Sequence, residues 1–140
     1  MQRLAAAGIG WLADDAANRE LIRVEGGVCA LTRLLDSADG CVQAQAAAAL
    51  SWLAHEEPTR RTLESLGCIP VLVKLLHSAQ SGTQSGAAVT LTLLADCPRR
   101  CELIAAEGAV HALTRLVRPY GGLGATPRPP IADAAAAAHA

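Results

Sequence analysis

Apolar residues in this chain recur at helical spacing over two kinds of segment. From about Val42 to His55 they follow the i, i+3, i+4, i+7 pattern of one helix face. A shorter stretch, Ile69 to His77, also places its leucines on one side, and the polar residues 78–82 end it. The patterns therefore predict a short helix followed by a long one. The expected buried residues are Leu72, Leu75 and Leu76 in the first, and Ala46, Ala47, Leu50, Leu53 and Ala54 in the second.

Another short helix is expected just before these two. It begins near Pro58, because proline at a helix start needs no partner for an N–H group. Gly67 ends it, since a left-handed turn favours a residue without a Cβ atom. Equivalent helices are expected before Gly26 and before Gly108. The helix before Gly67 carries the apolar residues Leu63 and Leu66. The helix before Gly26 carries Leu21 and Ile22, and the helix before Gly108 carries Leu103 and Ile104.

These segments belong to an internal repeat. Gly26, Gly67 and Gly108 recur at intervals of 41 residues (67 − 26 and 108 − 67). Many other positions keep the same interval without an insertion, as expected for a repeat protein. They include Leu31, Leu72 and Leu113; Leu34, Leu75 and Leu116; Ile9, Leu50 and Leu91; and Leu12, Leu53 and Leu94.

Composition agrees with an all-helical chain. Of the 140 residues, 51% are hydrophobic but only 2% are aromatic, and phenylalanine is absent. The apolar content is mostly alanine, leucine and valine. Alanine and leucine favour helices, whereas the β-branched and aromatic residues that favour strands are scarce.

The charge of the chain bears on which kinds of partner it could bind, and its cysteine content bears on its cellular compartment. The net charge is −1 and no cluster of basic residues exceeds two, so the chain lacks the footprint of a nucleic-acid-binding protein. No apolar run approaches the roughly 18 residues of a membrane span. Five cysteines, an odd number, and the absence of a secretory leader indicate reduced thiols. We therefore expect a soluble intracellular protein, cytoplasmic or nuclear.

The three-helix unit resembles the armadillo repeat. The segments that carry the resemblance are residues 18–22, residues 67–76 and the stretch from Gln43 to Ala54, which ends Ala-Leu-Ser-Trp-Leu-Ala. The resemblance covers about residues 1–118. HEAT repeats, the nearest alternative, are helical pairs without a glycine-hinged short first helix. The resemblance implies an all-α fold, a right-handed α-solenoid of three-helix repeats, here with a period of 41 residues.

This alignment divides the chain. Residues 1–13 are expected to be the third helix of a truncated repeat, 14–55 and 56–96 two armadillo repeats, and 97–118 the first two helices of a further repeat. Residues 119–130 form a Gly/Pro-rich loop, and 131–140 an Ala-rich tail that is either a disordered end or the start of another third helix. Since no polar capping repeat is visible, we expect a fragment of a longer armadillo-repeat protein.

No pattern in the sequence predicts catalysis. His55-Glu56-Glu57 lacks the second histidine of a zinc-protease helix, and Pro58 would break that helix. Cys97 and Cys101 have no second ligand pair at a zinc-site spacing, so we expect buried or half-buried free thiols. Residues 121–126 lack the lysine and the preceding strand of a phosphate loop. We predict no catalytic, cofactor-binding or metal-binding residue, no cofactor, no small-molecule substrate and no enzyme activity.

The third helices offer a binding surface instead. Stacked units would align these helices along a concave groove, and the residues opposite the buried stripe would line it. In the middle unit these residues are Gln45, Ala48, Trp52 and His55; the neighbouring units add Leu4, Ala7, Trp11 and Asp14, and Gly86, Val89, Leu93 and Asp96. The groove site is thus predicted to comprise Trp11, Trp52, Leu93, Ala7, Ala48, Val89, Gln45 and His55.

The importin-α adaptors, members of the same family, carry a Trp and an Asn four residues apart on this face. Here Ala7, Ala48 and Val89 stand at the Trp positions, and Trp11, Trp52 and Leu93 at the Asn positions. The resemblance therefore does not imply recognition of a basic import signal. The two tryptophans are either anchors for a partner on the groove or parts of the core between repeats.

The sequence thus predicts a protein-interaction scaffold that binds a protein or peptide segment along the groove. Two alternatives stay open: the substrate-recognition part of a U-box-type ubiquitin ligase, and a structural spacer without a groove ligand.

Overall fold

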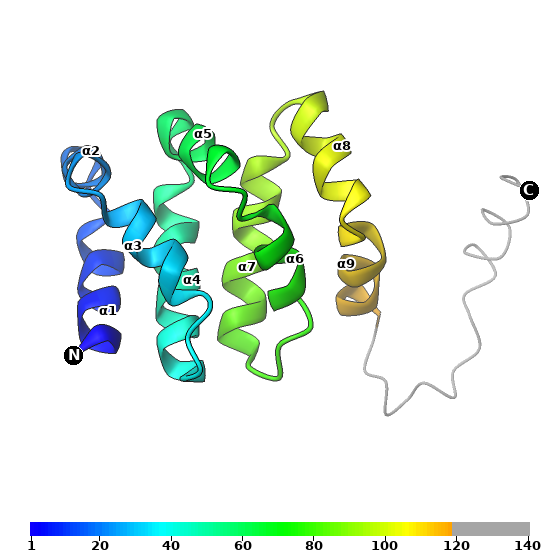
Figure 1. The fold of residues 1–140 in the computed structure, drawn as a ribbon, viewed down its shortest axis with the longest axis horizontal. Coiled ribbons are helices and arrows are strands. Elements are labelled where there is room, and N and C mark those ends of the chain that lie inside the picture. The colour runs from blue at the N-terminus through cyan, green and yellow to red at the C-terminus, as the bar shows by residue number, and fades with distance from the viewer. Residues whose placement is uncertain (119–140) are drawn as a thin grey trace, which may run out of the picture.

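The structure is a computed structural model that describes residues 1–118. This part of the chain is all-helical, which confirms the predicted all-α class, and its helices form one stack (Figure 1). Three longer helices, α1, α4 and α7, lie side by side, and two shorter helices follow each of them. The bounds are α1 Gln2–Leu12, α2 Ala16–Val24, α3 Gly27–Leu34, α4 Gly40–Leu53, α5 Glu57–Ser65, α6 Ile69–Leu75, α7 Ser81–Leu94, α8 Pro98–Ala106 and α9 Ala109–Val117. The loop predicted over 119–130 and the tail predicted over 131–140 lie outside the described residues.

Side-chain caps and turn residues set several helix ends. The Asp15 carboxylate accepts a hydrogen bond from the Asn18 backbone N–H at 3.1 Å and so caps α2. Asp39 accepts from the Cys41 N–H at 2.9 Å at the start of α4. Pro58 lies in the first turn of α5 and Pro98 begins α8, as predicted.

The three repeated glycines adopt the left-handed conformation that was predicted for them. Gly26, Gly67 and Gly108 have φ angles of 81°, 67° and 86°, which is the left-handed region where a Cβ atom is strained. Each glycine separates one short helix from the next, so the chain can turn sharply there. The expected long helix differs only at its ends: it begins at Gly40 and finishes at Leu53, whereas we predicted about 42–55. The expected helix 69–77 likewise ends earlier, at Leu75.

The core includes the leucines and alanines that the sequence pattern identified. Leu72, Leu75 and Leu76 are buried, and so is the predicted stripe of α4, namely Ala46, Ala47, Leu50, Leu53 and Ala54. Small residues let the long helices approach closely: a Cβ atom on Gly86 of α7 would lie 2.7 Å from two atoms of Ala47 on α4. The core is therefore continuous across the stack.

The long helices pack against one another and against short helices. α4 contacts both α1 and α7, α3 packs on α4, and α6 packs on α7. The contacts with α1, α3 and α7 cover α4 on three sides. The remaining side is open and carries the candidate site.

Candidate functional site

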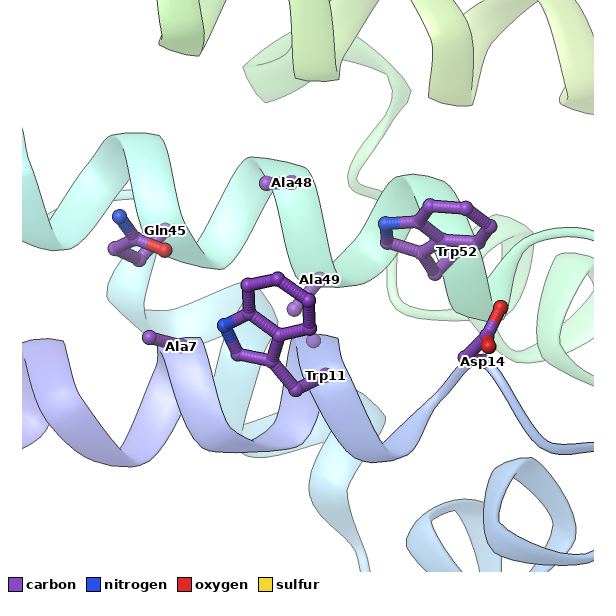
Figure 2. Close-up of a pocket in the computed structure, with 8 residues that line it drawn as sticks. Ala7, Trp11, Asp14, Gln45, Ala48, Ala49 and Trp52 are labelled. Atoms are coloured by element: carbon purple, nitrogen blue, oxygen red, sulfur yellow. The ribbon is translucent and has the colours of Figure 1, made fainter.

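The open face of α1 and α4 holds a cleft of about 470 Å³. Gly10 of α1 and Ala49 of α4 meet at its floor, where a Cβ atom on Gly10 would stand 3.7 Å from the Ala49 Cα atom. Small residues on both helices leave this space open, and two indole rings flank it (Figure 2). The lining residues are Ala7, Gly10, Trp11, Asp14, Gln45, Ala48, Ala49 and Trp52.

The two tryptophans are exposed, in contrast to the core alternative that the sequence left open. Trp11 is 84% exposed and Trp52 is 47% exposed. The ring of Trp52 also lies near the imidazole of His55, with ring centroids 6.2 Å apart and planes tilted by 45°. Two large apolar surfaces thus face solvent beside one cleft.

A second cleft, of about 300 Å³, adjoins the first along the same two helices. Both clefts share Ala7 and Gln45, so together they form one elongated depression. The other residues that line the second cleft are Arg3, Leu4, Cys41, Ala44 and Gln80.

The structure brings together five of the eight residues predicted for the groove. Ala7, Trp11, Gln45, Ala48 and Trp52 line the first cleft. His55 is exposed beside Trp52 but is not among the lining residues. Val89 (exposed) and Leu93 (half-buried) lie further along the stack on α7, where they line neither cleft.

One expected groove position is wrong, and sequence reasoning missed two others. Gly86 is buried between α7 and α4, because only a residue without a side chain fits against Ala47 there. Gly10 and Ala49 form the floor of the cleft. The pairing of small residues across the two helices could have indicated them, but only once the register between the helices was known.

Comparisons with known proteins agree with this architecture. Residues 58–96 match the model of the armadillo/β-catenin-like repeat. An engineered protein from the Northeast Structural Genomics Consortium is 34% identical, with a TM-score of 0.76 over 82% of this chain and 48% of that one. Residues 58–96 thus match an armadillo repeat, and the described chain has the fold of armadillo solenoids.

Designed armadillo proteins share the fold of this armadillo chain. One designed armadillo repeat protein is 23% identical, with a TM-score of 0.75 over 81% of this chain and 49% of its own. A structure described as computationally designed armadillo repeat proteins for modular peptide recognition is 24% identical, with a TM-score of 0.76 over 84% and 50%. The present chain spans about half the length of these proteins. A search of curated protein sequences found no match.

Arginines on α2 and α5 of this armadillo chain fix the ends of the long helices. The Arg19 guanidinium donates to the carbonyl oxygens of Ala13 and Asp14, at 2.8 and 3.1 Å, and pairs with Glu56 at 2.8 Å. Arg60 makes the same arrangement further along the stack, with the carbonyls of residues 54 and 55 and with Asp96. Each arginine therefore ties together three consecutive parts of the stack, at the end where the tryptophans lie.

A denser group of charges joins α5 to α8. Arg100 is 5% exposed and pairs with Glu57 at 3.1 Å and with Glu64 at 2.9 Å, and it also contacts Asp96. Hydrogen bonds from Arg100 lower the pKa of Asp96 to about 2 and also lower the pKa of Glu57. Hydrogen bonding to Glu57 in turn raises the pKa of Arg100. Each of the three carboxylates pairs with Arg100, so the cluster holds α5 and α8 together.

The thiols are not arranged for metal chemistry. Cys97 is half-buried as expected, but Cys101 is exposed, which corrects that part of the prediction. Cys101 occupies the register of Arg19 and Arg60, and its thiol faces the Ala95 carbonyl at 3.5 Å. Within residues 1–118, no group of three His, Cys, Asp or Glu side chains could hold a metal ion. None of the helices in that range is long and apolar enough to cross a membrane.

Proposed function

We propose that this armadillo chain is a protein-interaction scaffold that binds an extended partner segment along its third helices. In this proposal α1, α4 and α7 are the third helices of successive repeats, and their open faces form a concave groove. Trp11 and Trp52 anchor the partner segment, and Ala7, Ala48 and Gln45 shape the space beside the rings. Val89 and Leu93 continue the groove on α7.

The exposure of the two tryptophans beside one cleft carries this proposal. Trp side chains are highly buried on average in folded proteins. Here 84% of Trp11 and 47% of Trp52 face solvent. A tryptophan offers a large contact area with few rotatable bonds, which is why it is common among residues that dominate binding energy.

The spacing of the anchors suits an extended peptide. Packed helices lie about 10 Å apart, and an extended peptide rises about 3.3 Å per residue. Trp11 and Trp52, on adjacent helices, would therefore contact side chains roughly three residues apart. The small residues Gly10 and Ala49 between them leave room for the peptide backbone. The description of one structural neighbour as designed for modular peptide recognition agrees with this mode of binding.

Peptide selection tests the proposal without requiring a named partner. Peptides that bind the full chain would be selected from a displayed random library and their affinities measured by calorimetry. Replacing Trp11 or Trp52 by alanine should lower the affinity for each selected peptide about thirtyfold, because an anchor of this kind contributes about 2 kcal/mol to binding. Leu21→Ala and Leu66→Ala provide matched controls, since both leucines are exposed but lie on or just after α2 and α5, outside the clefts.

Two results would contradict the proposal. One is a set of selected peptides whose affinity depends on Leu21 or Leu66 but not on either tryptophan. The other is the failure of repeated selections to yield any binder, which would favour a structural spacer without a groove ligand. Circular dichroism of each variant verifies that the helices are intact. Neither the helices nor the comparisons bear on the ubiquitin-ligase alternative.

A further inference from the structure

The two adjoining clefts on α1 and α4 carry charges of opposite sign. Of the described residues that line the first cleft, only Asp14 is charged, and of those that line the second, only Arg3 is charged. The two residues lie about 16 Å apart along the α1 direction, from eleven residues (14 − 3) at the helical rise. A charged group of a partner would therefore be attracted to one cleft and repelled from the other.

The carboxylate of Asp14 is free to pair with a cation from outside. The Arg19 guanidinium donates to the backbone carbonyl of Asp14, at 3.1 Å, and forms its ion pair with Glu56, at 2.8 Å. Within residues 1–118, no ion pair and no side-chain hydrogen bond involves the Asp14 carboxylate. Asp14 is also exposed, so a ligand can reach it.

Asp96 shows how a carboxylate at this register is otherwise satisfied. It lies two repeat intervals after Asp14, since 96 − 14 = 82, and likewise just after a long helix. Asp96 pairs with Arg60 at 2.8 Å and also with Arg100. Asp14 holds the same place in its own unit without either pairing, so its negative charge is available to a partner.

Two indole rings stand beside this free charge. Asp14 lines the same cleft as Trp11 and Trp52, and its carboxylate points toward the end of α4 that carries Trp52 (Figure 2). The face of an indole ring attracts a cation through its quadrupole. The cleft therefore favours a group that joins a positive charge to an apolar stem. Lysine and arginine side chains have this composition.

We propose that the partner segment places one lysine or arginine side chain in the first cleft, with its stem along an indole ring and its cation beside the Asp14 carboxylate. This inference rests on the proposed binding function and adds the chemistry of the side chain that the cleft selects. Arg3 repels a further basic side chain that reaches the second cleft. The preferred segment thus carries a single basic residue at this place, not a run of them.

Peptides selected on the full chain from a displayed random library give the first test. They should share a lysine or arginine at one position. Asp14→Asn should lower the affinity for such a peptide about fivefold, as expected for the loss of an exposed ion pair. Asp36→Asn is the matched control, because Asp36 is exposed just after α3 and lines neither cleft. It should change the affinity less than about twofold.

A substitution in the peptide shows whether the two charges meet. Replacing the shared basic residue by norleucine keeps an apolar stem and removes the cation. On the parent chain this should lower the affinity about fivefold or more, and on Asp14→Asn the loss should be clearly smaller, because the charge that the cation would meet is gone. Equal losses on both chains would overturn the inference, since the basic residue would then bind elsewhere.

The selected peptides also separate this inference from the binding proposal. Peptides whose affinity depends on both tryptophans but that share no basic residue would overturn the inference and leave the tryptophan anchors in place. Peptides that keep full affinity for Trp11→Ala and Trp52→Ala would contradict the binding proposal, and the inference with it. A selected set dominated by runs of basic residues would contradict the repulsion assigned to Arg3.

Discussion

Gly86 provides a sensitive test of how closely the long helices pack. A Cβ atom at this position would lie 2.7 Å from the carbonyl carbon and from the Cβ of Ala47, and 2.9 Å from its carbonyl oxygen. These atoms belong to the backbone and to a rigid side chain, so a substitution forces α4 and α7 apart by several tenths of an ångström. At Gly82, one turn earlier, the nearest atom is the Ala44 Cβ at 3.6 Å, an ordinary contact.

The two glycines should therefore respond to alanine with opposite signs. Alanine is favoured over glycine in a helix by about 1 kcal/mol, and somewhat less near the first turn, where Gly82 lies. At Gly86 this gain is opposed by overpacking, which costs about 1–3 kcal/mol. We expect Gly86→Ala to lower the free energy of unfolding by up to about 2 kcal/mol and Gly82→Ala to raise it by up to about 1 kcal/mol.

Urea unfolding of the two variants, followed by circular dichroism at 222 nm, measures both changes. The informative quantity is the difference in unfolding free energy between the two variants, because both add the same methyl group to the same helix. If Gly86→Ala were as stable as Gly82→Ala, the close approach of α4 to α7 would be wrong.

Two further predictions concern titratable groups. The pKa of Asp96 is lowered to about 2 by its hydrogen bond from Arg100, so the pairing stabilises the folded state above about pH 4 and is lost as pH falls toward 2. The difference in unfolding free energy between the parent and Asp96→Asn should shrink over that range, and a difference that stays constant from about pH 4 to about pH 2 would contradict the pairing. Burial raises the pKa of the Cys68 thiol to about 11, and only the thiolate reacts. A thiol reagent at pH 8 should label the exposed Cys41 and Cys101 first and Cys68 only in urea; early labelling of Cys68, read by peptide mass mapping, would contradict its burial.

The sequence was sufficient to predict the features of the fold that recur in each repeat. The apolar stripe of α4 and the glycines that separate the short helices could be predicted because helix periodicity and backbone conformation are local properties. The exposure of Trp11 and Trp52 could not, since the same helix pattern is compatible with a groove or a core position. That choice depends on how α1 and α4 are rotated against each other.

The contacts of the arginines could not be predicted from the sequence either. Arg19 and Arg60 keep the repeat interval, but their bonds reach carbonyl groups of the preceding long helix and carboxylates of the following unit. Sequence spacing does not reveal that three segments meet at one guanidinium group. Gly86 is a similar case, because its position opposite the groove residues of α4 suggested an open face, whereas the close approach to Ala47 buries it.

The most direct test of the binding proposal uses the chain's own fluorescence. Trp11 and Trp52 are its only two tryptophans, so the variants Trp11→Leu and Trp52→Leu each report one ring. Each would be titrated with a selected peptide that lacks tryptophan, while calorimetry measures binding independently. The account predicts that both rings move from solvent into the contact, so that both emission spectra shift to the blue and saturate with the calorimetric curve. Binding by calorimetry with no change in either spectrum would place the partner elsewhere on the solenoid and contradict the groove as the functional site.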